Sequence, residues 1–167
     1  MTGKDCWAEW LAEKRPGGAP DERRGGLERL TRWRDSVLEN AGLSEGETLL
    51  DVGCGEGLIG LGALERGAGT VLFADISHDL LDVCREVATE LNVLERCRFV
   101  HAAADDLSAL QDGSVDVVTT RSVLIYVADK ESALHEFARV LRPGGRISLF
   151  EPINRFRSDE HRHMDGL

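Results

Sequence analysis

A short apolar run that ends next to an acidic residue and passes directly into alternating glycines constrains this chain more than any other feature. Residues 48–52 read TLLDV, and residues 53–57 read GCGEG. Apolar or β-branched side chains on both faces of the run predict a strand buried in the centre of a parallel sheet. The glycines allow the backbone to turn sharply, so a ligand can lie directly against it.

The composition predicts one globular domain and argues against a nucleic-acid partner. Of 167 residues, 42% are hydrophobic and 30% charged, which suits a single soluble core. Nucleic-acid affinity depends on Lys and Arg, whereas the formal net charge is -10, so a small or cationic ligand is favoured. No apolar stretch has membrane-spanning length and no signal-peptide core follows Met1, so we expect a cytoplasmic protein without membrane contact.

The four cysteines show no CxxC pairing. Three of them lie in apolar or element-like contexts, where a free thiol behaves as a small buried hydrophobe. We therefore expect structural thiols and no bound metal. The cysteines are Cys6, Cys54, Cys84 and Cys97.

From residue 49 onward, apolar runs alternate with segments of helical spacing, which indicates successive βαβ units and a parallel sheet. Helical spacing predicts crossover helices over residues 80–91 and 133–141, and another helix follows the glycines over 58–64. The RPGG sequence at 142–145 ends one helix, because proline cannot continue it and glycine frees the turn into the next strand. The predicted strands are 48–52, 70–75, 97–101, 115–119 and 146–151.

The region ahead of this core predicts a helical cap over residues 1–44, with a short amphipathic helix over 7–14 and a longer one over 27–41. The cap closes over a ligand in one interpretation and packs on the sheet edge in the other. The core is expected over residues 45–155, and a polar tail over 156–167. The arginines of the cap are expected to form mostly a solvated face: Arg23, Arg24, Arg29, Arg32 and Arg34.

Two ligand classes use a strand, a glycine loop and a helix in this order. Residues 55–60 satisfy the GxGxxG spacing of a dinucleotide fingerprint, and Asp75 lies 20 residues after Gly55, where a carboxylate can bind ribose hydroxyls. A nicotinamide cofactor is therefore one interpretation of the loop. GxGxxG alone is a weak signal, however, and Glu56 adds negative charge where a pyrophosphate would have to approach.

Three features together favour the second ligand class: Asp51 before the glycines, Glu56 within them, and the LRPGGRISL sequence at 141–149. Over residues 45–155 the chain resembles the class I S-adenosylmethionine-dependent methyltransferases. The resemblance implies an α/β, Rossmann-like, doubly wound and mainly parallel sheet of strand order 3-2-1-4-5. It also implies S-adenosylmethionine as cofactor and methyl transfer as activity.

Carried over residue by residue, the resemblance implies a set of cofactor contacts. Asp75 would hold the ribose hydroxyls with Ile76 beside the adenine, which the backbone of Ala104 and the carboxylate of Asp105 would read. Asp106 is the competing choice for Asp105, and its alternative role is to cap the following turn. Residues at the methionine end would be Asp51, Gly53, Cys54, Gly55 and Gly57.

After the fourth strand, Arg121 occupies the place from which the family contacts the methionine moiety and the acceptor. Arg121 either positions groups in the site or forms a salt bridge to a neighbouring acidic loop. Tyr126 either shapes the pocket or belongs to the core. The catalytic residue is left unassigned, because methyl transfer needs mainly orientation and exclusion of water. The candidate bases His78, His101 and His135 have no visible acid partner.

The sequence after the fourth and the fifth predicted strands differs from that of some family members. The chain has neither the Asn/Asp-Pro-Pro-aromatic phrase of enzymes that methylate amino groups of DNA bases nor a Pro-Cys nucleophile, which favours a small-molecule acceptor, with a protein acceptor as the alternative. The family's final hairpin has no counterpart after the fifth strand, so we expect either that a further segment is absent here or that a homo-oligomer or a partner chain covers that strand's edge. A non-catalytic subunit is therefore an alternative function. Metal binding through His161 and His163 of the tail has weak support.

Overall fold

The computed structural model describes residues 20–151, which form a five-stranded parallel sheet in the order β3-β2-β1-β4-β5. The predicted strand order is confirmed. The strands are β1 (Thr48–Val52), β2 (Thr70–Asp75), β3 (Cys97–His101), β4 (Val115–Arg121) and β5 (Leu141–Phe150). The helices are α2 (Pro20–Ala41), α3 (Leu58–Glu65), α4 (His78–Glu90) and α5 (Lys130–Val140), with a 3-10 turn η1 (Leu94–Arg96).

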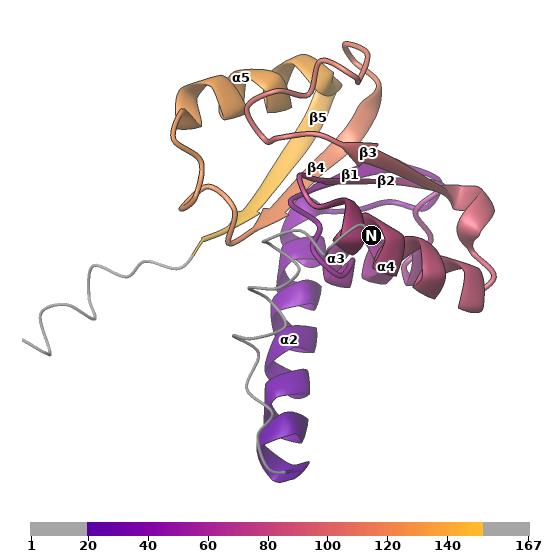
Figure 1. The fold of residues 1–167 in the computed structure, drawn as a ribbon. Helices are drawn as coiled ribbons and strands as arrows, with labels where there is room; N and C mark the ends of the chain where they lie inside the picture. The colour runs from indigo at the N-terminus through magenta and orange to yellow at the C-terminus, as the bar shows by residue number, and fades with distance from the viewer. Residues whose placement is uncertain (1–19, 152–167) are drawn as a thin grey trace, which may run out of the picture.

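Helices cover both faces of the sheet (Figure 1). Helix α5 lies on one face, and α2, α3 and α4 lie on the other. Each face has its own apolar layer, because successive side chains of β1 point to opposite sides. Leu49 belongs to the layer under α2, α3 and α4, whereas Leu50 and Val52 belong to the layer under α5. The apolar character of both faces of β1, visible in the sequence, thus reflects a central strand.

The two strands nearest the C-terminus differ from their predicted bounds. Strand β4 continues to Arg121, and β5 begins at Leu141 rather than at Arg146. Leu141 pairs with Val115 before the RPGG segment, and pairing resumes at Arg146 opposite Val117. The segment is therefore a bulge within the ladder instead of a turn that precedes it. The helical spacing could not show this, because Leu141 is compatible with the end of α5 and with a strand.

The end of α2 is part of the core. Val37, Leu38 and Ala41 are buried, and Ser148 Oγ of β5 donates a hydrogen bond of 2.8 Å to the Val37 carbonyl. The first turns of α2 extend away from the sheet (Figure 1). Arg32 is exposed, as predicted, whereas Arg34 is half-buried, and the side chains of Arg23, Arg24 and Arg29 lie outside the described part of the structure. Several sequence predictions lie outside the described residues: the helix over 7–14, Cys6, the tail from 156 and the histidines at 161 and 163.

The described cysteines Cys54, Cys84 and Cys97 are buried free thiols, in agreement with a structural role. A hydrogen bond with Cys84 and burial both raise the pKa of the Cys54 thiol, which keeps it neutral. Within residues 20–151, no group of three or more potential ligands is placed to hold a metal ion. None of the helices in this range combines the length and apolarity needed to cross a membrane.

Candidate functional site

A cavity of about 780 Å³ lies at the carboxyl ends of the strands, where open α/β sheets bind ligands. Its walls come from the glycine loop, the end of β2, the segment after β3, the segment after β4 and α2. All but one of the predicted cofactor residues line it: Asp51, Gly53, Cys54, Gly55, Asp75, Ile76, Ala104, Asp105 and Arg121. The exception is Gly57, which is the buried N-cap residue of α3.

The glycine loop fits closely on one side and opens to the cavity on the other. Gly53 has φ +64°, and a Cβ there would lie 2.3 Å from Val123 Cγ2. Gly55 has φ +55°, and a Cβ there would meet nothing within 4 Å. Both positions favour glycine for its left-handed backbone. Gly53 also allows close packing, whereas Gly55 leaves an open cradle in which a ligand can lie on the backbone.

Asp75 ties the loop to the neighbouring strand and helix. Its Oδ2 accepts a 2.9 Å hydrogen bond from the Gly55 backbone N–H, and its Oδ1 accepts one of 2.9 Å from Ser77. The side chain is 7% exposed and lines the cavity. A carboxylate oxygen can accept more than one hydrogen bond, so the group that holds the loop is also chemically suited to accept ribose hydroxyls.

Asp51 supports the loop from below. Its carboxylate is only 2% exposed, and its Oδ2 accepts a 2.9 Å hydrogen bond from the Gly60 N–H in the first turn of α3. Thr119 Oγ1 lies 3.3 Å from the other oxygen. Burial raises the pKa of Asp51 to about 7, although Arg121 acts in the opposite direction. Asp51 therefore titrates near neutral pH and fixes α3 relative to the sheet.

The raised pKa makes the contribution of Asp51 to stability dependent on pH. This contribution is fully present below the usual pKa of 3.8 and is lost as the pH rises through about 7. Asp51→Asn keeps an acceptor for Gly60 and cannot ionise. We expect the variant to gain up to about 4 kcal/mol over the wild type between pH 4 and pH 8. Urea unfolding of both proteins across this range measures the difference, and a difference independent of pH would contradict a buried titrating carboxylate.

In the segment after β3, some residues line the cavity and others stabilise the turn. Ala104 is 7% exposed and lines the cavity together with Asp105. Asp106 does not line this cavity, and its Oδ1 accepts a 3.1 Å hydrogen bond from the Ser108 N–H. The hydrogen bonds from Ser108 lower the pKa of Asp106. The structure thus places Asp106 in the turn-capping role that the sequence left open.

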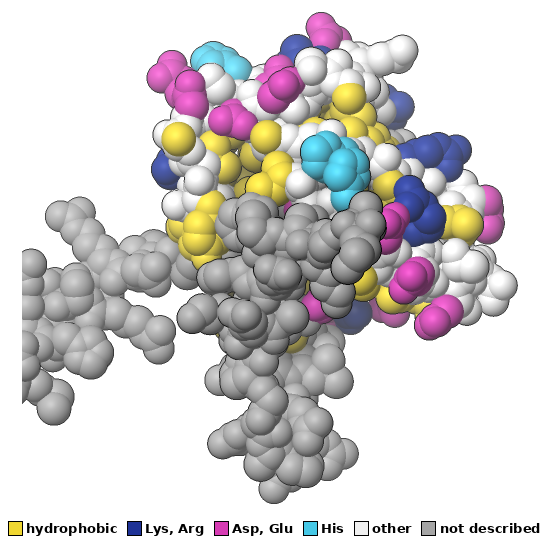
Figure 2. Space-filling model, in the orientation of Figure 1, with side chains coloured by type: hydrophobic (Ala, Val, Ile, Leu, Met, Phe, Trp, Pro, Cys, Tyr) yellow, Lys and Arg dark blue, Asp and Glu magenta, His cyan; other side chains and the backbone are white. Residues whose placement is uncertain are grey.

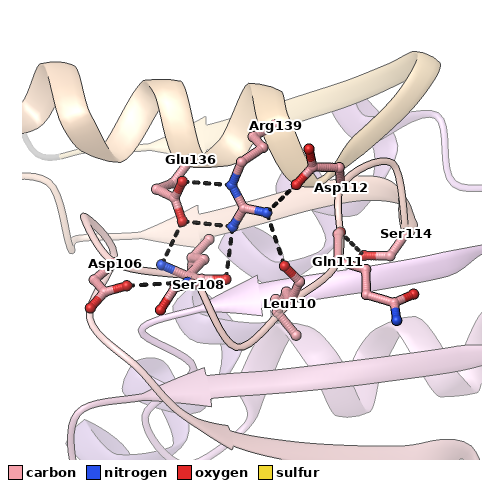
Figure 3. A network of polar contacts seen from close by, with 9 residues as sticks. Asp106, Ser108, Leu110, Gln111, Asp112, Ser114, Glu136 and Arg139 are labelled. Carbon is pink, nitrogen blue, oxygen red and sulfur yellow. Dashed lines mark hydrogen bonds and ion pairs between the residues drawn. The ribbon is translucent and has the colours of Figure 1, made fainter.

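A polar network from α5 holds this segment in place (Figure 3). Arg139 donates hydrogen bonds of 2.8 Å to the Leu107 carbonyl and 2.9 Å to the Leu110 carbonyl. Arg139 also pairs with Asp112 at 2.6 Å and with Glu136 at 2.7 Å. Glu136 in turn accepts a 2.7 Å hydrogen bond from the Leu107 N–H. The loop from Leu107 to Asp112 is therefore anchored to α5 on the sheet face away from the glycine loop's helix.

Removal of this anchor is expected to weaken the fold and the adjoining cavity wall together. Arg139→Ala leaves the Leu107 and Leu110 carbonyls without their charged donor, which costs at least about 2 kcal/mol. Arg139→Lys keeps the charge but not the planar fork, so we expect an intermediate loss. Thermal unfolding measures both variants. Equal stability of the alanine variant and the wild type would contradict the anchoring role.

The segment after β4 forms another wall of the cavity. Ser122 has φ 59°, which is uncommon for a residue other than glycine. The Arg121 guanidinium carbon lies 6.0 Å from the centre of the Trp33 ring, and Trp33 lies 5.7 Å from Phe150. Tyr126 is 53% exposed and lines the cavity. Its interpretation as a core residue is therefore wrong, because the apolar run around it turns at the surface.

The three described histidines do not line this cavity. The rings of His78 and His101 stack with their centres 3.8 Å apart, and His101 Nε2 lies 2.9 Å from the Ile76 carbonyl oxygen. His135 lies on α5, 3.8 Å from Glu131. Histidine and hydrophobic side chains lie close together on the face shown in Figure 2. The geometry therefore assigns none of these three histidines as a base in the cavity.

The sequence left open whether the N-terminal region closes over a ligand, and it expected Arg34 on a mostly solvated face. Leu30 and Arg34 line the cavity, and Arg34 crosses α3 at Gly62, where a Cβ would lie 2.4 Å from Arg34 Cδ. Arg34 donates a 3.1 Å hydrogen bond to Glu65. A glycine inside the predicted helix over 58–64 was the available signal of a close approach. The partner could not be identified, because Gly62 and Arg34 are distant in the chain.

The charges around the cavity fit a cationic ligand. Acidic side chains outnumber arginines, and buried pyrophosphate would meet repulsion from them. S-adenosylmethionine carries positive charge on its sulfonium and amino groups. The mainly acidic lining therefore matches S-adenosylmethionine better than it matches a dinucleotide. The acidic side chains are Asp51, Glu56, Glu65, Asp75 and Asp105, and the basic ones are Arg34 and Arg121.

Comparisons with known proteins find relatives over most of this chain. A family model described as a methyltransferase domain matches residues 50–149. The ubiquinone/menaquinone biosynthesis C-methyltransferase UbiE of Azotobacter vinelandii is 38% identical over 133 residues, covering 78% of this chain and 51% of the relative. The tRNA 5-carboxymethoxyuridine methyltransferase of Escherichia coli K12 is 33% identical, covering 83% of this chain and 53% of the relative.

A solved structure shares the fold. The crystal structure of the [4+2]-cyclase SpnF superimposes with a TM-score of 0.68 and 29% sequence identity. The match covers 72% of this chain and 44% of that chain. This chain spans about half the length of the curated relatives that it matches.

Proposed function

Because this chain belongs to the S-adenosylmethionine-dependent methyltransferases, we propose that it transfers a methyl group from S-adenosylmethionine to a small-molecule acceptor. The supporting observation is one acid-rich cavity of about 780 Å³ that brings the glycine loop, Asp75 and the segment after β4 together. This volume lies within the range of pockets for small ligands and cofactors. A cytoplasmic location stays a prediction.

The residues of the cavity orient the reactants. When bound, S-adenosylmethionine supplies an activated methyl group, which an acceptor nucleophile takes while the sulfur keeps the bonding electrons. Asp75 would hold the nucleoside end, the backbone at Gly53 and Gly55 would hold the methionine end, and the acidic lining would offset positive charge. Arg121 and Tyr126 face the same cavity from the segment after β4 and position the acceptor. Alignment of the two reactants and exclusion of water supply the rate enhancement.

The acceptor is proposed to be a small molecule rather than a nucleic acid. UbiE methylates carbon in quinone biosynthesis by name, whereas the Escherichia coli relative acts on tRNA. The formal net charge of -10 opposes contact with a phosphate backbone. The cavity wall near Tyr126 is apolar, with Val123, Val127 and Ala128 beside it. These features favour an uncharged or apolar acceptor.

Methyl transfer with labelled S-adenosylmethionine tests the proposal. The chain is incubated with a panel of phenols, quinols, amines and bulk tRNA, and S-adenosylhomocysteine is measured for each. We expect product with at least one small acceptor and none with tRNA, and none with the Asp75→Ala variant. Labelling of tRNA alone would contradict the small-molecule assignment.

A non-catalytic subunit is the second candidate, and the exposed side of β5 favours it. Within residues 20–151, β5 is the last strand of the sheet, and Ile147 and Leu149 are 38% and 44% exposed. Exposed strand edges invite pairing with another chain. We propose that a strand from a second copy or a partner chain covers β5.

Sedimentation velocity combined with the methyl-transfer assay tests this association. We expect a complex, and activity that rises with chain concentration or on addition of a co-purifying partner. A stable monomer with full methyl transfer would contradict both the second chain and the non-catalytic role.

A further inference from the structure

Glu151, the residue after β5, binds the segment that follows β4. Its Oε1 accepts hydrogen bonds of 2.9 Å from the Val123 N–H and 3.0 Å from the Leu124 N–H. The sequence shows Glu151 only as the end of a predicted strand. The contact joins residues that lie 28 positions apart at the carboxyl ends of two neighbouring strands.

The segment held by Glu151 contains a backbone conformation that does not persist without support. Ser122 has φ 59°, and its N–H donates a 2.8 Å hydrogen bond to the Phe150 carbonyl. Strained residues of this kind persist where the surroundings determine them, and they cluster at functional sites. Here two consecutive residues, Phe150 and Glu151, accept hydrogen bonds from the backbone at Ser122 and from the two residues that follow it.

The same segment sets the shape of the cavity at the glycine loop. The Val123 side chain lies against Gly53 so closely that a Cβ on Gly53 would be 2.3 Å from Val123 Cγ2. Arg121, Ser122 and Val123 all line the cavity. A shift of the Val123 backbone therefore changes the space above Gly53 directly.

We propose that Glu151 is a positioning residue that fixes Val123 against Gly53 and thereby shapes the end of the cavity at the first glycine. This inference rests on the proposed function, in which the end at Gly53 holds the methionine part of the cofactor. Glu151 acts through the backbone of Val123 and Leu124, and it does not line the cavity itself.

One oxygen of Glu151 carries this role. Oε2 is buried and has no hydrogen-bond partner among the described residues, so both donors depend on Oε1. A glutamine amide has an equivalent oxygen acceptor. Glu151→Gln therefore preserves the two hydrogen bonds, and Glu151→Ala removes them. This pair of variants separates the acceptor geometry from the negative charge.

Two ligands that differ only at the methionine end provide the readout. S-adenosylhomocysteine carries the amino acid part, and 5′-methylthioadenosine lacks it. Calorimetric titration of Glu151→Ala is expected to show a loss of about tenfold in affinity for S-adenosylhomocysteine and less than about twofold for 5′-methylthioadenosine. Glu151→Gln is expected to stay within about threefold of the wild type for both ligands.

Further variants keep the test decisive. Glu86→Ala changes an exposed glutamate of α4 and is expected to alter neither affinity. Val123→Ala retains both hydrogen bonds to Glu151 but removes the contact with Gly53, so it is expected to reproduce the selective loss even where Glu151→Ala does not fold. Equal losses for the two ligands, or no loss in either variant, would overturn the positioning role. A wild-type chain that binds neither ligand would instead refute the proposed function.

Discussion

Replacement of Asp75 by alanine is expected to abolish tight binding of S-adenosylmethionine and to destabilise the fold. The variant leaves the Gly55 and Ser77 N–H groups without their acceptor, which costs about 1–3 kcal/mol for each buried donor. It also removes the proposed ribose contact, worth about 1.5–3 kcal/mol in affinity. Chemical unfolding measures the first effect, and titration with S-adenosylhomocysteine measures the second.

Asp75→Asn is the matched control for this prediction. Its single carbonyl oxygen can accept from one of the two N–H groups, while the amide faces the other donor. Stability and affinity are therefore expected to fall in the order Asp, Asn, Ala. Unchanged affinity in the alanine variant would show that Asp75 does not contact the cofactor.

Gly53→Ala is expected to have the second largest effect. Gly53 has φ +64°, and the added Cβ would lie 2.3 Å from Val123 Cγ2, so the backbone strain and the clash act together. Strain of this kind costs about 1–3 kcal/mol, and overpacking adds about 1–3 kcal/mol. The loop or the segment after β4 must move, and affinity for S-adenosylhomocysteine is expected to fall with stability.

Gly46→Ala isolates the strain from the clash. Gly46 has φ +82°, and a Cβ there would meet nothing within 4 Å. We expect a smaller loss of stability and unchanged ligand affinity in this variant. The double variant Gly53→Ala/Val123→Ala relieves the clash and is expected to recover part of the lost stability. A Gly53→Ala variant as stable as Gly46→Ala would contradict the close packing of Val123 on Gly53.

The features that could be predicted from sequence are those encoded by neighbouring residues. Strands β1, β2 and β3 have the predicted bounds, because each is a short apolar run between turn residues. The glycine loop and Asp75 could be placed at one edge, since the carboxyl ends of parallel strands meet there. The resemblance to a family then supplied the strand order, which local patterns alone do not determine.

The features that could not be predicted depend on contacts between distant segments. Arg34 reaches the cavity across Gly62, and Glu151 reaches Val123 between two strands. The start of β5 depends on a bulge around Gly145, where a Cβ would lie 3.1 Å from the Asp116 carbonyl oxygen. None of these contacts has a signature in hydrophobic periodicity, because each depends on tertiary packing.

The most direct test of the central claim is a calorimetric titration of the chain with S-adenosylhomocysteine and, separately, with NADH. We predict that S-adenosylhomocysteine binds, that S-adenosylmethionine competes with it, and that Asp75→Ala removes the signal. NADH is predicted to give no binding heat, because the acidic lining opposes a pyrophosphate. Binding of NADH without binding of S-adenosylhomocysteine would contradict the assignment of the cavity.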